Sequence, residues 1–434
     1  MKEVTQLLFY TAPDQYDVEA KIVAIYKNGE MLILKTNPIV FFPGSGGQPA
    51  DKGWIGEVPV IGYEALPEGT VSLKADEKSL VRYPVVEEKA WKAIFPALPE
   101  ESQPVTLNCR IDRAHREEYR EQHTGQHLAS GLLKKLFDVD TVSVHFGEET
   151  TTLEIAQESL PEGYREKLEG EANKMIQENA ALRTFWIYEE KEVEPLRRKP
   201  KTGGPLRVVE IDGIDRTACS GVHLSTLAPL RLLLVLQEER IRGRLRLHIL
   251  TGQRSVRRLK KDEEVLFSLR SLCTVGTEDL PEVVRSLKEE NRLLRLKLLT
   301  LQKKAASLQM HEWLQGAYPL RGRIEDKGVY LCIDAEPDWD LRVIEEAFLN
   351  QARGIILVGR HQENNSKGVT FLVTQNQELV QVVDLRELLK GALSVSGGKG
   401  GGSPNRLQGS FPSVEQWEQF KVAVKNTLHS LGWI

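Results

Sequence analysis

Two pairs of residues with metal-binding side chains stand out, because the members of each pair are four positions apart. His123 and His127 lie in a helical pattern, where one turn brings residues at this spacing to the same face. Cys219 and His223 repeat the spacing. Three imidazoles and one thiolate match the four-coordinate sites that proteins build for zinc. Either pair alone is more typical of ordinary surface or core residues, but the two pairs together predict one zinc ion per chain.

The sequence leaves the chemistry of this zinc site open. A structural zinc is closed by four protein ligands, whereas a catalytic zinc keeps one position for water or substrate. No glutamate stands between His123 and His127, so the sequence disfavours a metallopeptidase. Gln122 is the candidate for a catalytic side chain beside the metal, and His145 is a second polar candidate. Purely structural roles suit both residues equally well.

A glycine-rich segment from Phe41 to Asp51 is the second feature that could do chemistry. Its glycines allow a ligand to approach the backbone closely, and Ser45 and Gln48 can hydrogen-bond polar groups. Taken alone, such a segment is more typical of an ordinary cluster of β-turns.

The surrounding elements predict an α+β protein with several domains. Residues 1–108 contain short apolar runs broken by glycine and proline, with an Asn-Gly hairpin signal, and predict a small β-barrel. Residues 109–252 predict a mixed α+β zinc-binding domain, and residues 253–312 predict a long helical segment. Residues 313–434 alternate strands and helices and predict a small α/β domain.

The helical segment carries leucines at every seventh position. These are Leu280, Leu287, Leu294, Leu301 and Leu308. Asn291 occupies one of the intervening core positions, and a single polar residue there fixes register in many coiled coils. One interpretation is a homodimeric coiled coil through residues 280–308. The other is a helical hairpin within one chain, closed against residues 256–272, and the sequence favours neither.

The composition is that of an ordinary globular protein. The 434 residues are 41% hydrophobic and 28% charged, with no apolar run of membrane-spanning length and no signal-peptide pattern. Four scattered cysteines in a chain of this length predict a reducing, cytoplasmic environment. Because the net charge is −4, a nucleic-acid-binding face would require local segregation of charge.

Such segregation occurs between Arg231 and Lys261, where ten Lys or Arg residues accompany two acidic residues. Arg242, Arg244 and Arg246 alternate with apolar residues on a predicted strand, so their side chains would share one face. We interpret them as candidate phosphate contacts, with a solvated outer face as the alternative.

Three segments occur in the order found in the editing domain of alanyl-tRNA synthetase, and the chain resembles that domain. They are Phe42–Asp51, His123–Leu128 and Cys219–His223, and the stretch Arg207–Arg216 is also similar. Residues 397–409 resemble the glycine-rich signature of the domain that ends alanyl-tRNA synthetases and certain DHH-type phosphoesterases. Because no synthetase core precedes these segments, the chain resembles the long AlaX form of free-standing alanyl-tRNA editing proteins.

The resemblance implies a deacylase acting in trans, which hydrolyses the ester joining serine, or glycine, to the tRNA specific for alanine. It implies that one zinc ion is bound by His123, His127, Cys219 and His223. The residues expected near the aminoacyl group are Ser45, Gly46, Gly47, Gln48 and Thr124. The residues expected to contact tRNA are Arg242, Arg244, Arg246, Lys399 and Arg406. The C-terminal domain would hold the tRNA body, and the helical segment would support a homodimer.

Several residues depart from the family pattern. The family often has glycine where this chain has Ser220, threonine where it has Val222, and alanine where it has Gly125. Gly44 replaces a threonine of many short forms, and Ser403-Pro404-Asn405 replaces the usual Arg-Pro-Asp. These departures spare the zinc ligands and fall on residues expected to affect substrate choice and tRNA binding.

Two other functions are compatible with part of the sequence. In a non-catalytic tRNA-binding module the zinc would be structural, and no hydrolysis would occur. A phosphoesterase is disfavoured because the sequence has no Asp-His-His tripeptide to hold its metals. Lys399 is not followed by the Ser or Thr of a phosphate-binding P-loop, so ATP binding is not expected.

Overall fold

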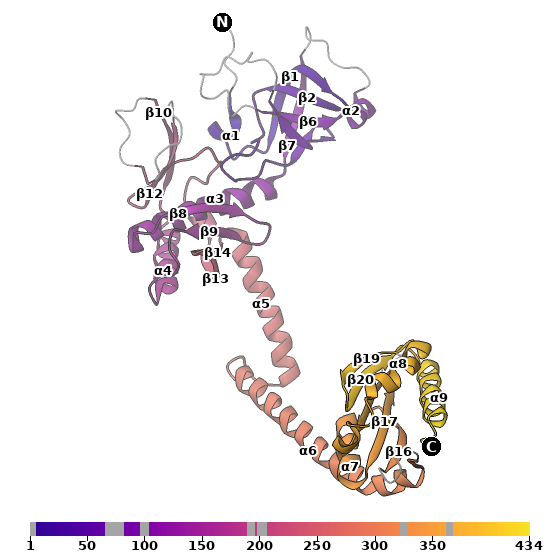
Figure 1. Cartoon of the computed structure of the whole chain (residues 1–434). Coiled ribbons are helices and arrows are strands. Elements are labelled where there is room, and N and C mark those ends of the chain that lie inside the picture. The colour runs from indigo at the N-terminus through magenta and orange to yellow at the C-terminus, as the bar shows by residue number, and fades with distance from the viewer. Residues whose placement is uncertain are drawn as a thin grey trace. The chain divides into compact units, whose positions relative to one another are not determined.

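The computed structural model describes residues 6–65, 82–95, 104–188, 196–197, 206–321, 328–361 and 368–434. The chain divides into two compact units, Met1–Ser268 and Leu269–Ile434 (Figure 1). The finer boundaries at residues 108, 252 and 312 stay predictions. Within the described ranges, no helix combines the length and the apolar character needed to cross a membrane.

Seven antiparallel strands form a curled sheet at the start of the first unit. They are β1 (Asp17–Asn28), β2 (Met31–Asn37), β3 (Gly53–Ile55), β4 (Val58–Pro59), β5 (Gly62–Glu64), β6 (Tyr83–Glu87) and β7 (Val105–Ile111), in the order β4-β3-β7-β1-β2-β6-β5. Two short helices, α1 (Leu8–Thr11) and α2 (Glu88–Ile94), accompany the sheet. The predicted Asn-Gly hairpin is confirmed, since Gly29 has a positive φ between β1 and β2.

The predicted closed barrel is corrected to a half-barrel. The edge strands β4 and β5 have only two and three residues, and they pair with β3 and β6 rather than with each other. Closing a barrel requires continuous pairing around the whole sheet. The described residues therefore form an open sheet whose concave side is filled by Leu34, Val86 and Trp91.

A long helix, α3 (Arg113–Phe137), follows the half-barrel and is capped by the Asp112 side chain. Around it lie β8 (Thr141–Phe146), β9 (Thr151–Ile155), α4 (Tyr164–Gln177), β10 (Leu182–Ile187), β11 (Leu206–Ile211), β12 (Asp215–Ala218), η3 (Ala228–Leu230), β13 (Leu234–Ile241) and β14 (Arg244–Leu250). The strands make two sheets, β10-β11-β12 and β13-β14-β9-β8. Leu128 and Leu132 of α3 pack into the shared core with Leu153 and Val209.

Helices α5 (Gly252–Cys273) and α6 (Leu280–Gln315) confirm the predicted helical segment. The C-terminal end of α6 packs through Ala306 and Met310 against the second unit's sheet. The leucine seam of the same helix is different, because Leu287, Leu294 and Leu301 are 54%, 54% and 63% exposed. The seam is therefore uncovered within the second unit.

Beyond α6, the second unit alternates strands and helices, as predicted for residues 313–434. Its remaining elements are β15 (Tyr318–Pro319), β16 (Val329–Ala335), α7 (Leu341–Gln351), β17 (Gly354–His361), β18 (Val369–Gln375), η5 (Gln377–Leu379), α8 (Leu385–Ser396), β19 (Lys399–Ser403), β20 (Arg406–Phe411) and α9 (Val414–Ser430). The strand order is β15-β16-β17-β18-β20-β19, with β16 and β17 parallel and joined through α7. The segment Asn364–Gly368 predicts a connection between two strands, and β17 and β18 lie on either side of it; its first four residues lie outside the described residues.

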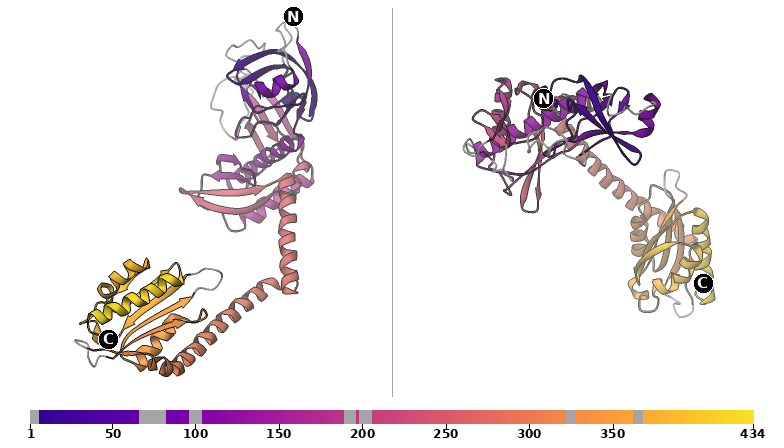
Figure 2. Two further views of the ribbon diagram at one scale, coloured as in Figure 1. Left: turned by 90° about the vertical axis from the view of Figure 1, so that its right-hand side faces the viewer. Right: turned by 90° about the horizontal axis from the view of Figure 1, so that it is seen from above.

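The two faces of this sheet are covered differently. Helices α8 and α9 cover one face, where Trp417 and Phe420 pack on Phe371 and Phe411 (Figure 2). Helices α6 and α7 cover only part of the other face, over β16 and β17. The polar side chains of β18 and β20 on that face line an open hollow.

Candidate metal centre and its pocket

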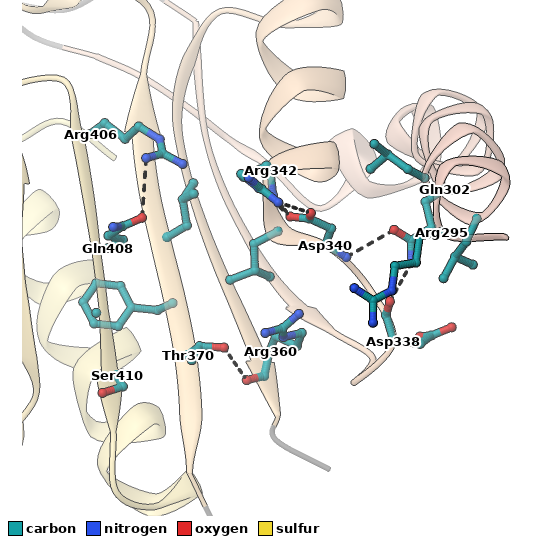
Figure 3. Close-up of a pocket in the computed structure, with 16 residues that line it drawn as sticks. Arg295, Gln302, Asp338, Asp340, Arg342, Arg360, Thr370, Arg406, Gln408 and Ser410 are labelled. Carbon is teal, nitrogen blue, oxygen red and sulfur yellow. Dashed lines mark hydrogen bonds and ion pairs between the residues drawn. The ribbon is translucent and has the colours of Figure 1, made fainter. Parts of the chain in front are cut away.

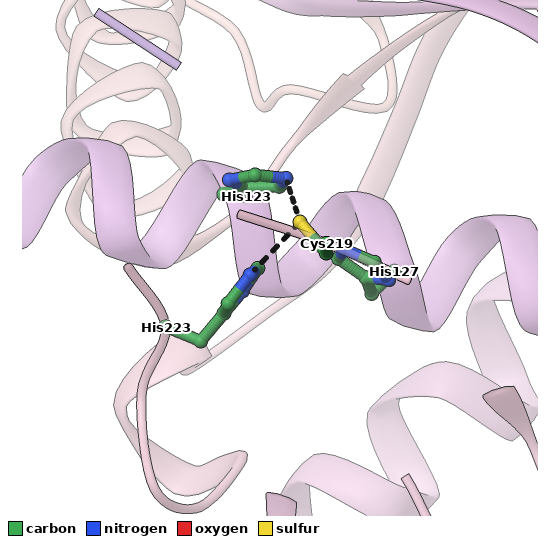
Figure 4. A group of neighbouring side chains, drawn as sticks. All are labelled: His123, His127, Cys219 and His223. Carbon is green, nitrogen blue, oxygen red and sulfur yellow. Dashed lines mark hydrogen bonds between the residues drawn. The ribbon is translucent and has the colours of Figure 1, made fainter. Parts of the chain in front are cut away.

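The structure brings the two predicted pairs together. Helix α3 supplies His123 and His127, and the loop after β12 supplies Cys219 and His223 (Figure 4). Their candidate ligand atoms all lie within 4.8 Å of one another. The Cys219 Sγ atom is 3.4 Å from His123 Nε2 and 3.3 Å from His223 Nε2. The predicted convergence of the four side chains is confirmed, and together they could hold one metal ion.

Hydrogen bonds orient the imidazole rings from outside the cluster. His123 donates from Nδ1 to Gln48 Oε1 at 2.8 Å, and His127 donates from Nδ1 to Asp215 Oδ2 at 2.7 Å. Both rings thus present Nε2 to the cluster, which is how histidine ligands are commonly held. His127 Nε2 is buried without a hydrogen-bond partner among the described residues, and so is His223 Nδ1. The orphaned His127 Nε2 fits a bound metal ion, because burying it unpaired is costly. His223 presents Nε2 to Cys219, so its orphaned Nδ1 lies on the other side of the ring from the cluster.

Asp215 is the centre of a buried network behind His127. Arg197 donates to its two oxygens at 2.6 and 3.2 Å, and the Thr217 hydroxyl donates at 2.6 Å. Burial alone raises the pKa of Asp215, but His127 and Arg197 outweigh burial and lower the pKa to about 2. The sequence analysis missed Asp215, although it lies in the Arg207–Arg216 stretch that resembles the editing domain.

The electrostatics of the cluster favour an ionised cysteine. Burial alone raises the pKa of the Cys219 thiol, but the surrounding imidazoles outweigh burial and hold this pKa well below its usual value. Burial lowers the pKa of His127, whereas the Cys219 thiolate and Asp215 raise it, to about 9. Burial likewise lowers the pKa values of His123 and His223, and it dominates there. The thiolate is the form of cysteine that binds metals.

The loop that carries Cys219 and His223 is held by hydrogen bonds that neighbouring side chains donate to its backbone carbonyls. Arg207 donates to the carbonyls of Cys219 and Gly221 at 3.1 and 2.6 Å, and the Tyr10 hydroxyl donates to that of Ser220 at 2.5 Å. Arg120 of α3 donates to the His223 carbonyl at 3.1 Å. These bonds fix the loop against the half-barrel on one side and α3 on the other.

The glycine segment forms a tight turn beside the cluster. Ser45 and Gln48 exchange backbone hydrogen bonds of 3.2 and 3.0 Å, and Gly46 and Gly47 both have positive φ angles, which explains the two glycines. The Ser45 hydroxyl oxygen lies 2.6 Å from that of Ser220. The Gln48 side chain is buried, and its Oε1 accepts hydrogen bonds from both His123 and the Val222 backbone. Gln48 therefore positions a ligand.

A pocket of 370 Å³ opens beside the ligands, a size at the small end for ligand sites. Gly46 and Gly47 line it, together with His123, His127 and Cys219. Its other polar lining residues are Gln126, Thr141, Arg197, Thr217 and Ser220. The pocket thus combines the candidate metal site with backbone and hydroxyl groups that can hydrogen-bond a small polar ligand.

Five of the residues predicted as substrate contacts or catalytic candidates lie outside this pocket lining, namely Ser45, Gln48, Gln122, Thr124 and His145. The Gln122 amide donates to the Thr251 carbonyl at 2.9 Å and accepts from the Thr151 hydroxyl at 3.3 Å. The Thr124 hydroxyl oxygen accepts from the Leu224 backbone at 3.1 Å. His145 is exposed on β8. In this structure Gln122 and Thr124 hold neighbouring segments in place.

The predicted arginine stripe needs one correction. Arg244 and Arg246 lie on β14, but Arg242 lies in the preceding turn with a positive φ of 49°. The predicted alternation of arginine with apolar residues does not include Arg242, because Arg242 and Gly243 form the turn between β13 and β14. Arg246 is also paired, at 2.5 Å with Glu154 and at 3.0 Å with Glu239.

The open face of the second unit holds a larger hollow of 820 Å³ (Figure 3). Four arginines line it, namely Arg295, Arg342, Arg360 and Arg406. Arg342 pairs with Asp340 and Arg406 with Glu345, at 2.7 and 2.8 Å. Lys399 lies on the exposed edge strand β19 and pairs in register with Ser410 of the hollow. Arg406 and Lys399 are thus on or near one polar surface.

The Asp215 network yields a direct prediction about metal affinity. Changing Asp215→Asn removes the charge that orients His127, and we expect metal affinity to fall by about 10- to 100-fold. Competition with a chromophoric chelator measures this affinity. Asp212→Asn, on the neighbouring exposed turn, is the matched control and keeps wild-type affinity. Equal affinities for the two variants would contradict the assigned role of Asp215.

Comparison with known proteins gives consistent relatives over nearly the whole chain, although no protein-family model matches. Alanyl-tRNA editing protein AlaX-L of Pyrococcus horikoshii is 24% identical over 434 residues, covering 97% of this chain and 98% of the relative. Alanyl-tRNA editing protein Aarsd1-A of Xenopus laevis is 24% identical over 398 residues, covering 90% and 87%. The alanine–tRNA ligase of Pyrococcus furiosus is 25% identical over 437 residues, covering 98% of this chain and 44% of the ligase.

Among solved structures, the C-Ala domain of Aquifex aeolicus alanyl-tRNA synthetase matches 23% of this chain and 87% of that domain. The identity is 18% and the TM-score 0.20. The full-length relatives agree with the resemblance seen in the sequence motifs: over nearly its whole length, the chain is similar to the alanyl-tRNA editing proteins AlaX-L and Aarsd1.

Proposed function

We propose that this protein is an aminoacyl-tRNA deacylase that hydrolyses the ester of serine, or of glycine, on the tRNA specific for alanine. The observation that carries the proposal is the convergence of His123, His127, Cys219 and His223 beside a small polar pocket. The relatives named alanyl-tRNA editing proteins support the substrate class.

Zinc is the metal that the donor set fits best. Three imidazole nitrogens and one thiolate suit the four-coordinate geometry of zinc, whereas magnesium and calcium prefer oxygen ligands. When bound, a zinc ion can polarise a carbonyl group or lower the pKa of a bound water. Gln48 and Asp215 keep His123 and His127 in the tautomers that such an ion needs.

The pocket must favour hydrolysis of seryl or glycyl esters over that of the correct alanyl ester. A synthetase pocket shaped for alanine cannot exclude glycine and rejects serine imperfectly, so a second sieve is needed. We assign the aminoacyl group to the side of the pocket formed by Gly46, Gly47 and Ser220, whose hydroxyl lies 2.6 Å from that of Ser45. Gln48 and Thr124, which we expected beside the substrate, already bond the protein, and we assign them to positioning.

Contacts with the tRNA backbone are assigned to two basic surfaces. In the second unit, Arg360 and Lys399 lie on or beside the open sheet face, where phosphates can reach them. Arg406 lines the same face but is already paired with Glu345 and contributes less. In the first unit, Arg242 and Arg244 are exposed at the tip of the β13–β14 hairpin. Arg246 contributes less, because its guanidinium is already neutralised by two glutamates.

We also propose that α6 forms a parallel homodimer through residues 280–308. An apolar seam that is more than half exposed costs free energy in water, and a second copy would cover it. Asn291 in the middle of the seam would pair with its counterpart and fix the register.

The dimer proposal predicts a mass of twice 49.0 kDa at micromolar concentration. The double variant Leu294→Glu, Leu301→Glu places charges in the seam, and we expect its dimer dissociation constant to rise by about 100-fold or more. Sedimentation analysis measures this constant. Leu293→Glu, an exposed leucine on the same helix outside the seam, is the matched control. A wild-type protein that remains monomeric with normal stability would refute the dimer.

The deacylase proposal predicts rapid loss of serine from serine-charged alanine tRNA, with alanine-charged tRNA spared. Stripping the metal abolishes the loss, and His123→Ala lowers the rate by about two orders of magnitude or more. The assay follows the charged fraction of each tRNA over time. His429→Ala, at an exposed position on α9, controls for the loss of a histidine. If the metal-loaded protein binds tRNA but hydrolyses neither ester, the protein is a binding module with a structural zinc.

A further inference from the structure

Ser220 lines the pocket, and its hydroxyl contacts the hydroxyl of Ser45 on another loop. It follows Cys219 directly and lines the pocket with Gly46 and Gly47. Its hydroxyl oxygen lies 2.6 Å from that of Ser45. Across the described ranges, each of the two hydroxyls has the other as its one hydrogen-bond partner, and both side chains are half-buried.

Both hydroxyls are carried on backbone that is fixed from several sides. The Ser45 backbone is closed onto Gln48, and Gln48 in turn bonds His123 and the Val222 backbone. The Ser220 carbonyl accepts from Tyr10, and the peptide groups on either side of Ser220 are held by Arg207. Groups fixed in this way bind a ligand without an added cost of ordering themselves.

The hydrogen-bond capacity of the pair exceeds what the protein uses. Two hydroxyls have two donor protons and four acceptor lone pairs, and their mutual bond uses one of each. The pair can therefore still donate one bond and accept others. A third hydroxyl, which is itself both donor and acceptor, is the group that complements this capacity, whereas a hydrogen atom or a methyl group is not.

We propose that Ser220, acting with Ser45, is a specificity-determining residue that binds the side-chain hydroxyl of a seryl ester. This inference rests on the deacylase function proposed above and names the group that selects its substrate. Because Ser220 is adjacent to Cys219, a hydroxyl bound there places the rest of the aminoacyl group beside the metal ligands. Glycine at this position would lack the hydroxyl and leave Ser45 without its partner.

The size of the selection follows from the pairing of the two serines. When a glycyl ester occupies the pocket, the two hydroxyls still satisfy each other, so no buried group is left unpaired. The preference for serine then reflects only the bonds gained, which corresponds to about 10-fold for one hydrogen bond of ordinary strength. The two serines therefore give a preference for the seryl ester and do not exclude the glycyl ester.

The test compares seryl and glycyl esters on the same alanine tRNA. We expect Ser220→Ala to lower kcat/KM for the seryl ester by about 10-fold and to leave the glycyl ester within about twofold. The double variant Ser45→Ala, Ser220→Ala should lose little more than either single variant, because the two hydroxyls act as one unit. Ser225→Ala, an exposed serine on the same loop, is the matched control.

A second readout does not depend on turnover. Wild-type protein should bind tRNA carrying amide-linked serine more tightly than tRNA carrying amide-linked glycine, and Ser220→Ala should remove the difference while zinc content stays unchanged. Equal losses of kcat/KM on the seryl and glycyl esters would show that the hydrogen bond between Ser45 and Ser220 only holds two loops together, and would overturn the inference. An unchanged seryl rate would overturn it as well. Failure of the wild-type protein on both esters would instead overturn the proposed function, and this inference with it.

Discussion

Helix α3 buries polar and charged side chains along one face, and each of them must be paired because an unpaired charge in a core is costly. Arg116, Arg120, His123 and His127 follow one another at intervals of four, three and four residues, and each is 2% exposed. Arg116 forms a buried ion pair with Asp51, and Arg120 reaches Asp14 and the His223 carbonyl. Hydrogen-bond and ion-pair partners of these side chains come from the half-barrel, the glycine turn and the Cys219 loop. All three segments therefore pack against this one helix.

This constraint explains why the candidate site lies where three parts of the first unit meet. Asp51, which pairs with Arg116, also accepts a hydrogen bond from the Phe42 backbone and so fixes the start of the glycine segment. About two turns further along α3, His123 meets that segment again through Gln48. The opposite side of α3 binds the start of α5, where Glu121 accepts from the Gln253 backbone. The candidate metal-binding residues are therefore held by the same contacts that assemble the unit.

The four side chains that converge could be predicted from sequence because their types and four-residue spacing are local properties. Asp215 and Gln48 could not be assigned their roles, since each bonds a histidine more than 70 residues away in the chain. The hydrogen bond from the Leu224 backbone to the Thr124 hydroxyl could not be predicted either, because the two residues are 100 positions apart in the chain. Barrel closure depended on strand pairings at the sheet edges, and the short strands β4 and β5 leave that sheet open. The leucine repeat predicted α6 correctly, since its period is set within one helix.

The measurement that tests the central claim most directly is X-ray absorption spectroscopy at the zinc edge of the zinc-loaded protein. We expect one sulfur ligand at about 2.3 Å and three nitrogen ligands at about 2.0 Å, with the sulfur contribution lost in Cys219→Ser. A bound zinc with no sulfur ligand, or a spectrum unchanged in that variant, would contradict the assignment of His123, His127, Cys219 and His223 as one metal centre.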